Sequence, residues 1–403
     1  MLATFKKSTL KGVVSAPPSK SMAHRYLIGA ALSGEKCTLS HVDYSEDILA
    51  SIDCLKALGA DIKTDKDTVV VESDEFMKSE NPVLECRESG STLRFFVPLA
   101  LCLNKTVTLG GSERLFERPL DVYETLCKDN NFTFIKDKNS LTLCGNLRSG
   151  TYKIKGDISS QFITGLIFAL VYLGEDSTLE IIPPFESKSY VNLTISALRS
   201  FGADVEFTDE YKIKIKASKL HSFSGVIEGD YSNAAFFDAL NLFGGNVLVK
   251  GLDSDSLQGD RVYKDYFSAL KTQKNKKIDL TDCPDLAPIL FSIAAANGGG
   301  EFIGTKRLRI KESDRSAVMA EELKKFGINL KMGDNTVTVE KGELKKPTTI
   351  LKGHNDHRIV MALCVLLTVT GGKIEGAEAV KKSLPDFFEL ISSLGIEVNK
   401  YES

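Results

Sequence analysis

The sequence predicts an α/β protein in which one unit of helices and strands is repeated six times. At four places a helical pattern runs into a glycine, and the alternation of polar and apolar residues typical of a half-buried strand follows. These places recur at a regular interval. The chain of 403 residues, of which 42% are hydrophobic and 26% charged, is long enough for two buried cores.

The four junctions share a helix end, a glycine and the start of a strand. Glycine suits the left-handed residue with which many helices end, and strand-like segments follow at 68–72, 211–216 and 336–340. The junctions are Leu55–Ile62, Leu198–Val205, Leu323–Leu330 and Ile391–Val398.

The spacing of the junctions indicates six copies. The first two glycines are 143 residues apart and the last two 68 apart, so a step of about 70 residues fits both intervals. Weaker copies fill the gaps at 126–134 and 270–278, where Asn130, Asn131 and Asn275 stand in place of glycine. Asparagine is the next residue most tolerant of a left-handed backbone. The alternative is that helix ends of this common kind coincide by chance.

The repeats also define the predicted domain boundaries, because no linker rich in glycine, proline or serine is present. Three units run to about Ser224, and three more begin at Gly229. We therefore expect two lobes of similar size, each containing three units.

Composition excludes several classes of protein. A net charge of -3 argues against a nucleic-acid binder. Residues 1–14 lack the apolar stretch of a signal peptide, which favours the cytoplasm, and the apolar runs at 95–103 and 361–369 are too short for a membrane span and indicate core helices. Eight cysteines without a Cys-x-x-Cys pair and five histidines without zinc spacing predict reduced, mostly buried thiols, with no disulfide and no structural metal.

Several predicted helix starts combine a hydroxyl with a cation, which is the pattern of an anion site. Ser19, Lys20 and Ser21 precede an apolar helix, and Arg25 lies four residues after Ser21 on the same face. We place Lys20 just before the first turn. Unpaired N–H groups in a first helical turn point at anions, and a nearby cation supplies the countercharge. The alternative is an ordinary cap with a solvated Lys and Arg.

Two further helix starts fit the same pattern. Gly90 lets a ligand approach the backbone, and Arg94 either braces that loop or reaches the ligand. Ser159, Ser160 and Gln161 begin another apolar helix, although simple serine capping explains this segment equally well.

The segment Lys311-Glu312-Ser313-Asp314-Arg315 suggests acid–base chemistry. Lys311 and Arg315 are expected on one helical face with Glu312 close to both, and a carboxylate between cations can carry a proton. The alternative is a solvated salt-bridge helix. Asp285 precedes an apolar helix at 289–296, where it is either a helix cap or a buried base.

The candidate cations suit two anionic substrates held side by side. Asp356, His357 and Arg358 open one more apolar helix, and Lys382 lies near the C-terminus. The full set of cations is Lys20, Arg25, Arg94, Arg118, Lys311, Arg315, Arg358 and Lys382.

Taken together and in this order, these motifs resemble the EPSP synthase family of enolpyruvyl transferases over essentially the whole chain. The resemblance implies two lobes, each an inverse α/β barrel of three units, with the active site in the cleft between them. One lobe would contain 1–17 and 229–403, and the other 18–228. It also implies a monomer that needs neither cofactor nor metal.

The resemblance implies roles for individual residues. The enolpyruvyl group of phosphoenolpyruvate would pass to the 5-hydroxyl of shikimate 3-phosphate, with Asp285 as base at the hydroxyl, Glu312 as acid at C3 and Lys20 assisting. Shikimate 3-phosphate would contact Lys20, Ser21, Arg25, Ser159, Ser160, Gln161, Ser187, Asp285 and Lys311. Phosphoenolpyruvate would contact Lys20, Gly90, Arg118, Gln161, Arg315, Arg358 and Lys382.

Three positions depart from the commonest family pattern. Glu88 and Arg307 stand where asparagine is frequent, and Ser91 where threonine is frequent, so Glu88 and Arg307 are left out of the predicted site. Gly90 predicts sensitivity to the family inhibitor glyphosate.

Two other functions compete with this interpretation. The sister transferase that acts on UDP-N-acetylglucosamine usually has a cysteine in the loop before its Arg-Pro, and the loop 110–118 has none. A non-catalytic protein that binds phosphorylated metabolites would gain nothing from the negative charges of Asp285 and Glu312.

Overall fold

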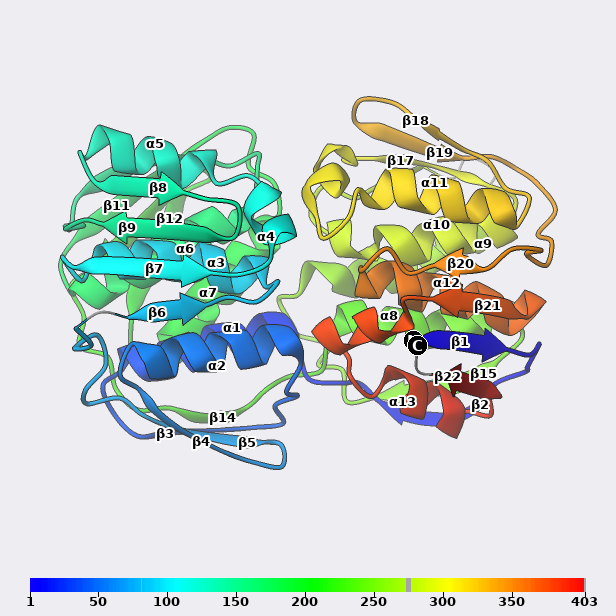
Figure 1. Ribbon diagram of the computed structural model, residues 1–403, viewed down its shortest axis with the longest axis horizontal. Coiled ribbons are helices and arrows are strands. Elements are labelled where there is room, and N and C mark those ends of the chain that lie inside the picture. The colour runs from blue at the N-terminus through cyan, green and yellow to red at the C-terminus, as the bar shows by residue number, and fades with distance from the viewer. Residues whose placement is uncertain (81, 273–276, 402–403) are drawn as a thin grey trace. The chain divides into compact units, whose positions relative to one another are not determined.

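The computed structural model describes residues 1–80, 82–272 and 277–401. The chain folds into two compact units, Pro18–Glu228 and a second unit of Met1–Pro17 with Gly229–Ser403 (Figure 1). Each unit has its own hydrophobic core. The weak repeat copy predicted around Asn275 lies in part outside the described residues.

The unit Pro18–Glu228 contains three four-stranded sheets in blue, cyan and green (Figure 1). Its helices are α1 (Lys20–Leu32), α2 (Glu46–Ala57), α3 (Gly90–Leu101), α4 (Glu113–Glu117), α5 (Asp121–Asp129), α6 (Ser160–Leu173) and α7 (Lys188–Ser200). The first sheet has β14 (Ser224–Val226), β3 (Cys37–Ser40), β5 (Thr68–Glu72) and β4 (Asp61–Asp65). The second has β6 (Val83–Glu85), β7 (Thr106–Gly110), β9 (Ser140–Cys144) and β8 (Thr133–Lys136). The third has β10 (Thr151–Lys155), β11 (Ser177–Ile182), β13 (Lys212–Lys216) and β12 (Asp204–Asp209).

The other unit contains two four-stranded sheets and one pair of strands. Its sheets are β20 (Leu351–Lys352), β21 (Gly372–Glu375), β1 (Leu2–Phe5) and β22 (Val398–Tyr401); β16 (Lys277–Asp279), β17 (Gly300–Ile303), β19 (Thr336–Val339) and β18 (Leu330–Met332); and the pair β15 (Asn246–Lys250) and β2 (Lys11–Ser15). Its α-helices are α8 (Tyr231–Ala239), α9 (Tyr263–Thr272), α10 (Ala287–Ala296), α11 (Arg315–Lys325), α12 (His357–Thr370) and α13 (Phe387–Ser393). Its 3-10 helices are η1 (Leu240–Phe243), η2 (Gly259–Val262), η3 (Pro284–Leu286), η4 (Lys306–Ile310) and η5 (Ala377–Lys382).

One strand arrangement recurs through both units. In each four-stranded sheet one pair is parallel and the next two pairs are antiparallel, as in β10, β11, β13 and β12. The six predicted repeats are therefore confirmed, one of them reduced to the parallel pair β2 and β15. The four predicted junction glycines all have positive φ, between 84° and 104°, and Asn131 has φ 56° at the degenerate copy.

Three helices occupy the centre of each unit. In one unit α6 packs on α1 and α3, and in the other α8, α10 and α12 pack on one another. These helices are buried nearly all round, so the sheets lie outside them (Figure 1). They are therefore not amphipathic surface helices, because strands cover each of them on one side and the other central helices cover it on the other. The apolar runs at 95–103 and 361–369 lie mostly within α3 and α12, which confirms them as core.

Helix direction places the central N-termini at one end of the sheets. The helices α3, α6, α10 and α12 each connect two parallel strands, so each begins where the first strand of its pair ends. Over the described residues, no helix has the length and apolar character needed to cross a bilayer.

Candidate functional site

Five of the six central helices, all except α10, carry a polar cap at the N-terminus. Ser19, Ser89 and Ser159 cap α1, α3 and α6, and each accepts a hydrogen bond from a backbone N–H in the first turn. Asp230 and Asp356 cap α8 and α12 in the same way. The remaining N–H groups of these first turns give each unit a concentration of positive potential, which attracts anions.

The N-terminal end of α1 holds two of the predicted cations. Lys20 is the first residue of α1, so the expectation that it precedes the first turn is wrong, and its ammonium lies 2.7 Å from the Asp47 carboxylate on α2. Arg25 is 3% exposed and donates to the carbonyls of Ser21 and Tyr190 and to the Thr194 hydroxyl. Burial lowers the pKa of Arg25 to about 10. The alternative of a solvated Lys and Arg is therefore wrong.

Arg118 and Gly90 meet at the start of α3. A Cβ on Gly90 would lie 2.4 Å from Nη1 of Arg118, so only glycine leaves room for this guanidinium beside the first turn. Arg118 is 5% exposed and follows directly on α4. The structure thus brings two residues that are far apart in the sequence to one helix N-terminus.

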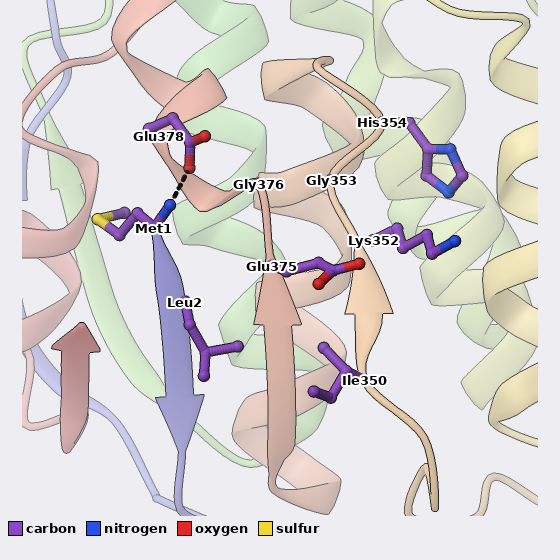
Figure 2. Close-up of a pocket in the computed structure, with 9 residues that line it drawn as sticks. All are labelled: Met1, Leu2, Ile350, Lys352, Gly353, His354, Glu375, Gly376 and Glu378. Atoms are coloured by element: carbon purple, nitrogen blue, oxygen red, sulfur yellow. Dashed lines mark hydrogen bonds and ion pairs between the residues drawn. The ribbon is translucent and has the colours of Figure 1, made fainter. Parts of the chain in front are cut away.

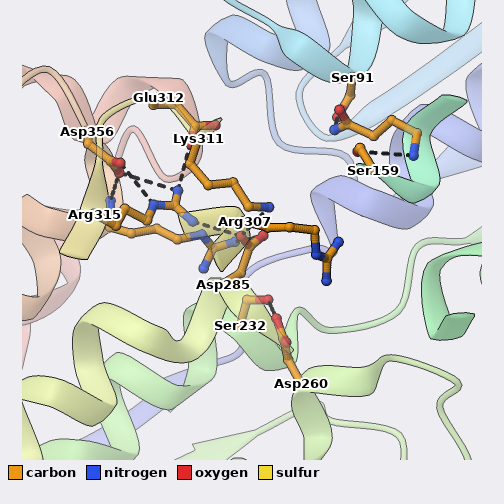
Figure 3. Close-up of polar contacts among 12 residues, drawn as sticks. Ser91, Ser159, Ser232, Asp260, Asp285, Arg307, Lys311, Glu312, Arg315 and Asp356 are labelled. Carbon is orange, nitrogen blue, oxygen red and sulfur yellow. Dashed lines mark hydrogen bonds and ion pairs between the residues drawn. The ribbon is translucent and has the colours of Figure 1, made fainter. Parts of the chain in front are cut away.

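The start of α6 lies next to that of α3. Gln161 accepts from Arg94 through Oε1 at 2.7 Å and donates to the Ser91 hydroxyl at 2.9 Å. Figure 3 labels Ser91 and Ser159, and Ser159 is the N-cap of α6. Arg94 also donates to the carbonyl of Pro119 at 3.1 Å, in the loop that follows α4. Ser159 is thus a helix cap, as the simple capping alternative has it, and this role is compatible with a ligand at the same helix start.

The two remaining serines of this unit are also buried at helix starts. Ser160 is the first residue of α6 and is 5% exposed. Ser187 is the N-cap of α7 and is 2% exposed, with a left-handed backbone at φ 55°. A serine held at positive φ is strained, and such strain gathers at functional sites.

In the other unit, three cations surround Asp285 (Figure 3). Oδ1 lies 3.1 Å from Nζ of Lys311 and 2.8 Å from Nη1 of Arg315, and Oδ2 lies 3.1 Å from Nη2 of Arg358. Burial opposes ionisation of Asp285, yet the three cations together hold its pKa well below the usual range. Asp285 is therefore a carboxylate whose basicity depends on where these cations are.

Arg315 is fully engaged by carboxylates. It is 1% exposed, and it contacts Asp356 at 2.9 Å and Glu312 at 2.8 Å besides Asp285. Burial alone would lower its pKa, but Asp356, Glu312 and Asp285 raise it above the ordinary value. Asp356 also accepts from Ser313 at 3.0 Å. The alternative of a solvated salt-bridge helix is therefore wrong.

Two sequence predictions about this cluster need correction. Lys311 and Arg315 do not share a helical face, because α11 begins only at Arg315 and Lys311 lies in the segment before it. Both side chains nevertheless contact Oδ1 of Asp285, because the non-helical segment before α11 brings Lys311 close to it. Asp285 is not a helix cap either: it lies in η3, and the N-cap of α10 is Leu286.

Lys382 and Arg307 complete the buried cations of this unit. Nζ of Lys382 donates to the carbonyl of Asn355 at 2.6 Å, beside the start of α12. Arg307 is 6% exposed and donates to the carbonyl of Thr281 at 2.6 Å. Burial lowers the pKa of Lys311, with Asp285 opposing the shift and Arg315, then Arg307, adding to it.

Sequence reasoning missed two carboxylates that hold these cations. Asp47 pairs with Lys20, and Asp356 pairs with Arg315. Asp356 had a signal, because it directly precedes an apolar helix as capping residues do. For Asp47 no comparable signal exists, since its partner is 27 residues away on another helix.

One group of side chains outside these clusters resembles a metal site. Glu321, Glu322 and His354 place one ligand atom each within 4.8 Å of one another. However, both carboxylate oxygens of Glu322 already accept hydrogen bonds, from Lys325, from the backbone N–H of Lys352 and from His354. His354 also lines a cavity of about 490 Å³ (Figure 2), and none of the predicted site residues lines that cavity.

Comparisons with known proteins agree with the fold and the motifs. A family model described as EPSP synthase (3-phosphoshikimate 1-carboxyvinyltransferase) matches residues 5–391. A curated 3-phosphoshikimate 1-carboxyvinyltransferase of Clostridium kluyveri is 38% identical, covering 99% of this chain and 98% of the relative. One from Clostridium novyi is 37% identical over 96% of each.

Solved structures show the same fold at lower identity. An EPSP synthase from Acinetobacter baumannii is 22% identical with a TM-score of 0.80, covering 99% of this chain and all of that one. The enolpyruvyl transferase NikO from Streptomyces tendae is 15% identical with a TM-score of 0.76, covering all of this chain and 99% of that one. The predicted fold class is thereby confirmed. The match of the family model over nearly the whole length shows that this chain belongs to the EPSP synthase (3-phosphoshikimate 1-carboxyvinyltransferase) family.

Proposed function

We propose that this chain transfers the enolpyruvyl group of phosphoenolpyruvate to the 5-hydroxyl of shikimate 3-phosphate, releasing phosphate and 5-enolpyruvylshikimate 3-phosphate. The observation that carries the proposal is the partly buried Asp285 surrounded by Lys311, Arg315 and Arg358 in a chain of this family. Cations around one carboxylate suit a reaction that joins two highly anionic substrates at a hydroxyl.

The residues that we propose for the substrates come from both units. For shikimate 3-phosphate they are Lys20, Ser21, Arg25, Ser159, Ser160, Gln161, Ser187, Asp285 and Lys311. For phosphoenolpyruvate they are Lys20, Gly90, Arg118, Gln161, Arg315, Arg358 and Lys382. We further propose that the protein acts as a cytoplasmic monomer and that the reaction uses neither cofactor nor metal.

The first step is an addition. The 5-hydroxyl oxygen bonds to C2 of phosphoenolpyruvate while Asp285 takes the hydroxyl proton, and Glu312, assisted by Lys20, delivers a proton to C3. The product of this step is a tetrahedral intermediate. In the second step C3 loses a proton, the double bond between C2 and C3 forms again, and the C2–O bond to phosphate breaks.

Substrate binding itself would make Asp285 a better base. In the free protein Arg358, Lys311 and Arg315 hold its pKa low. The carboxylate and phosphate groups of the substrates compete for Arg358 and Lys311, and each cation that leaves Asp285 raises the pKa of the carboxyl toward its ordinary value. Asp285 would therefore be the strongest base when both substrates are present.

The test is phosphate release from phosphoenolpyruvate. Release that depends on shikimate 3-phosphate supports the proposal, and release only with UDP-N-acetylglucosamine would assign the chain to the sister reaction. Binding of both substrates without turnover would make it a non-catalytic binding protein.

A further inference from the structure

A buried chain of hydrogen bonds joins three helices of the unit Pro18–Glu228. Nδ1 of His24 on α1 lies 2.8 Å from Oγ of Ser51 on α2, which lies 2.8 Å from Oγ1 of Thr92 on α3. Thr92 in turn lies 2.7 Å from Oγ of Ser89, the N-cap of α3. All four residues are at most 1% exposed. Polar groups so deeply buried are costly unless they are paired, and hydrogen bonds between buried side chains fix the elements that they join.

Thr92 is the residue where this chain meets the candidate site. Its hydroxyl also lies 3.4 Å from the carbonyl of Asp47, and the carboxylate of Asp47 holds Lys20 at 2.7 Å. Its backbone N–H donates to Ser89 at 3.2 Å. Gly90, which packs against Arg118, lies between Ser89 and Thr92 in the same first turn.

We infer that His24, Ser51 and Thr92 are positioning residues, which hold the first turn of α3 in register with the Lys20–Asp47 pair. The inference rests on the proposed function, in which Gly90 and Lys20 both contact phosphoenolpyruvate. None of these three residues is among those proposed to contact a substrate. A ligand that bridges two helix starts binds well only when the starts keep their spacing, so the network sets affinity for phosphoenolpyruvate.

The hydrogens of the network can be assigned from the imidazole. Burial, then Lys20 and Arg25, hold the pKa of His24 well below its ordinary value, so only one ring nitrogen carries a hydrogen. Nε2 has no hydrogen-bond partner among the described residues. A buried N–H without a partner is rarer in proteins than a buried acceptor without one. The hydrogen therefore lies on Nδ1, and the chain of donors runs from His24 through Ser51 and Thr92 to Ser89.

Isosteric substitution separates positioning from packing. Thr92→Val keeps the shape of the side chain but removes its hydroxyl, whereas Thr92→Ser keeps the hydroxyl and loses a methyl group. Ser73→Ala is a matched control: Ser73 is 4% exposed and its hydroxyl donates to the carbonyl of Ala30 at 3.2 Å, at the other end of α1.

The experiment measures kcat and both KM values by phosphate release. Thr92→Val is expected to raise the KM for phosphoenolpyruvate about tenfold, which corresponds to about 1.4 kcal/mol, and that for shikimate 3-phosphate by less than threefold. Thr92→Ser should stay within about threefold of the wild type for both substrates, and Ser73→Ala should behave as the wild type. An equal loss in Thr92→Val and Thr92→Ser, or no change in Thr92→Val, would overturn the inference.

A second readout does not depend on activity. In ¹⁵N NMR spectra of the whole chain, His24 should appear as the Nδ1–H tautomer across neutral pH, and Ser51→Ala should shift its Nδ1 signal. An Nε2–H tautomer, or a signal that Ser51→Ala leaves unchanged, would contradict the network. If the wild type releases no phosphate with both substrates, the proposed function fails, and these spectra still decide whether the network exists.

Discussion

Replacing Asp285 by asparagine should destroy turnover while strengthening the attraction of the site for anions. The substitution removes one negative charge from a point where Lys311, Arg315 and Arg358 lie 2.8 to 3.1 Å away. At such separations two unit charges interact by about 5 kcal/mol at an effective dielectric constant of 20. Removing one partner of a buried ion pair costs about 3–5 kcal/mol because the remaining charges stay buried.

We therefore expect Asp285→Asn to destabilise the free protein by about 3 kcal/mol, the lower end of that range, since the Asp285 side chain is 19% exposed. Inorganic phosphate should restore much of this loss, because it supplies the missing negative charge, and it should raise the melting temperature of the variant more than that of the wild type. Turnover should fall by about a hundredfold or more, because no group replaces the base.

Thermal unfolding with increasing phosphate and the phosphate-release assay measure these two effects. Glu301→Gln is the matched control, since it removes the same charge from an exposed pair with Lys277 in the same unit and should change neither quantity. Near-normal turnover in Asp285→Asn would refute its role as base. A smaller response to phosphate than in the wild type would refute the competition between Asp285 and anions.

Three further predictions follow from the same geometry. Glu312→Gln keeps a hydrogen bond to Arg315 and should lower kcat by about a hundredfold or more with little change in melting temperature or KM; an unchanged kcat would argue against proton delivery by Glu312. Gly90→Ala would push Arg118 from its place and should raise the KM for phosphoenolpyruvate about tenfold, and an unchanged KM would show that Arg118 does not contact that substrate. Burial, then proximity to Asp285, raises the pKa of Asp260 to about 7. The free energy of unfolding of the wild type is therefore highest below about pH 4, the pKa of this carboxyl in the unfolded chain. It falls by about 4 kcal/mol as the pH rises from there through 7. Asp260→Asn should therefore raise the melting temperature relative to the wild type more at pH 8 than at pH 5. An equal difference at both pH values would contradict the raised pKa.

Much of the fold was predictable because its repeats leave local marks. A glycine or asparagine at the end of a helix is required by the left-handed backbone itself, as Gly59 and Asn131 show. Such a mark needs no knowledge of tertiary contacts. The complete burial of α6 could not be read in the same way, because helical pattern alone does not tell how many sides of a helix other elements cover.

The sequence predicted the parts of the candidate site that lie at helix starts, but it did not predict the ion pairs between residues on different helices. Ser19 and Lys20 can be recognised in the sequence because an apolar helical pattern follows them, and the structure places both at the start of α1. Asp47, in contrast, is recognisable only by its partner, which another helix carries. Lys311 shows a different limit: it was expected to share a helical face with Arg315, but α11 begins only at Arg315, and the two cations meet at Asp285 instead.

The pairing of β1 with β21 and β22 has a consequence for synthesis on the ribosome. Leu2 lies opposite Tyr401 and Glu375, so the sheet of β1 can close only after β21 and β22 have been translated. The segment Pro18–Glu228 is continuous and contains every strand of its own three sheets. Because contacts between distant residues form late, this segment can complete its core while the remainder is still being translated. Until β21 and β22 have been translated, β1 lacks both of the strands that pair with it.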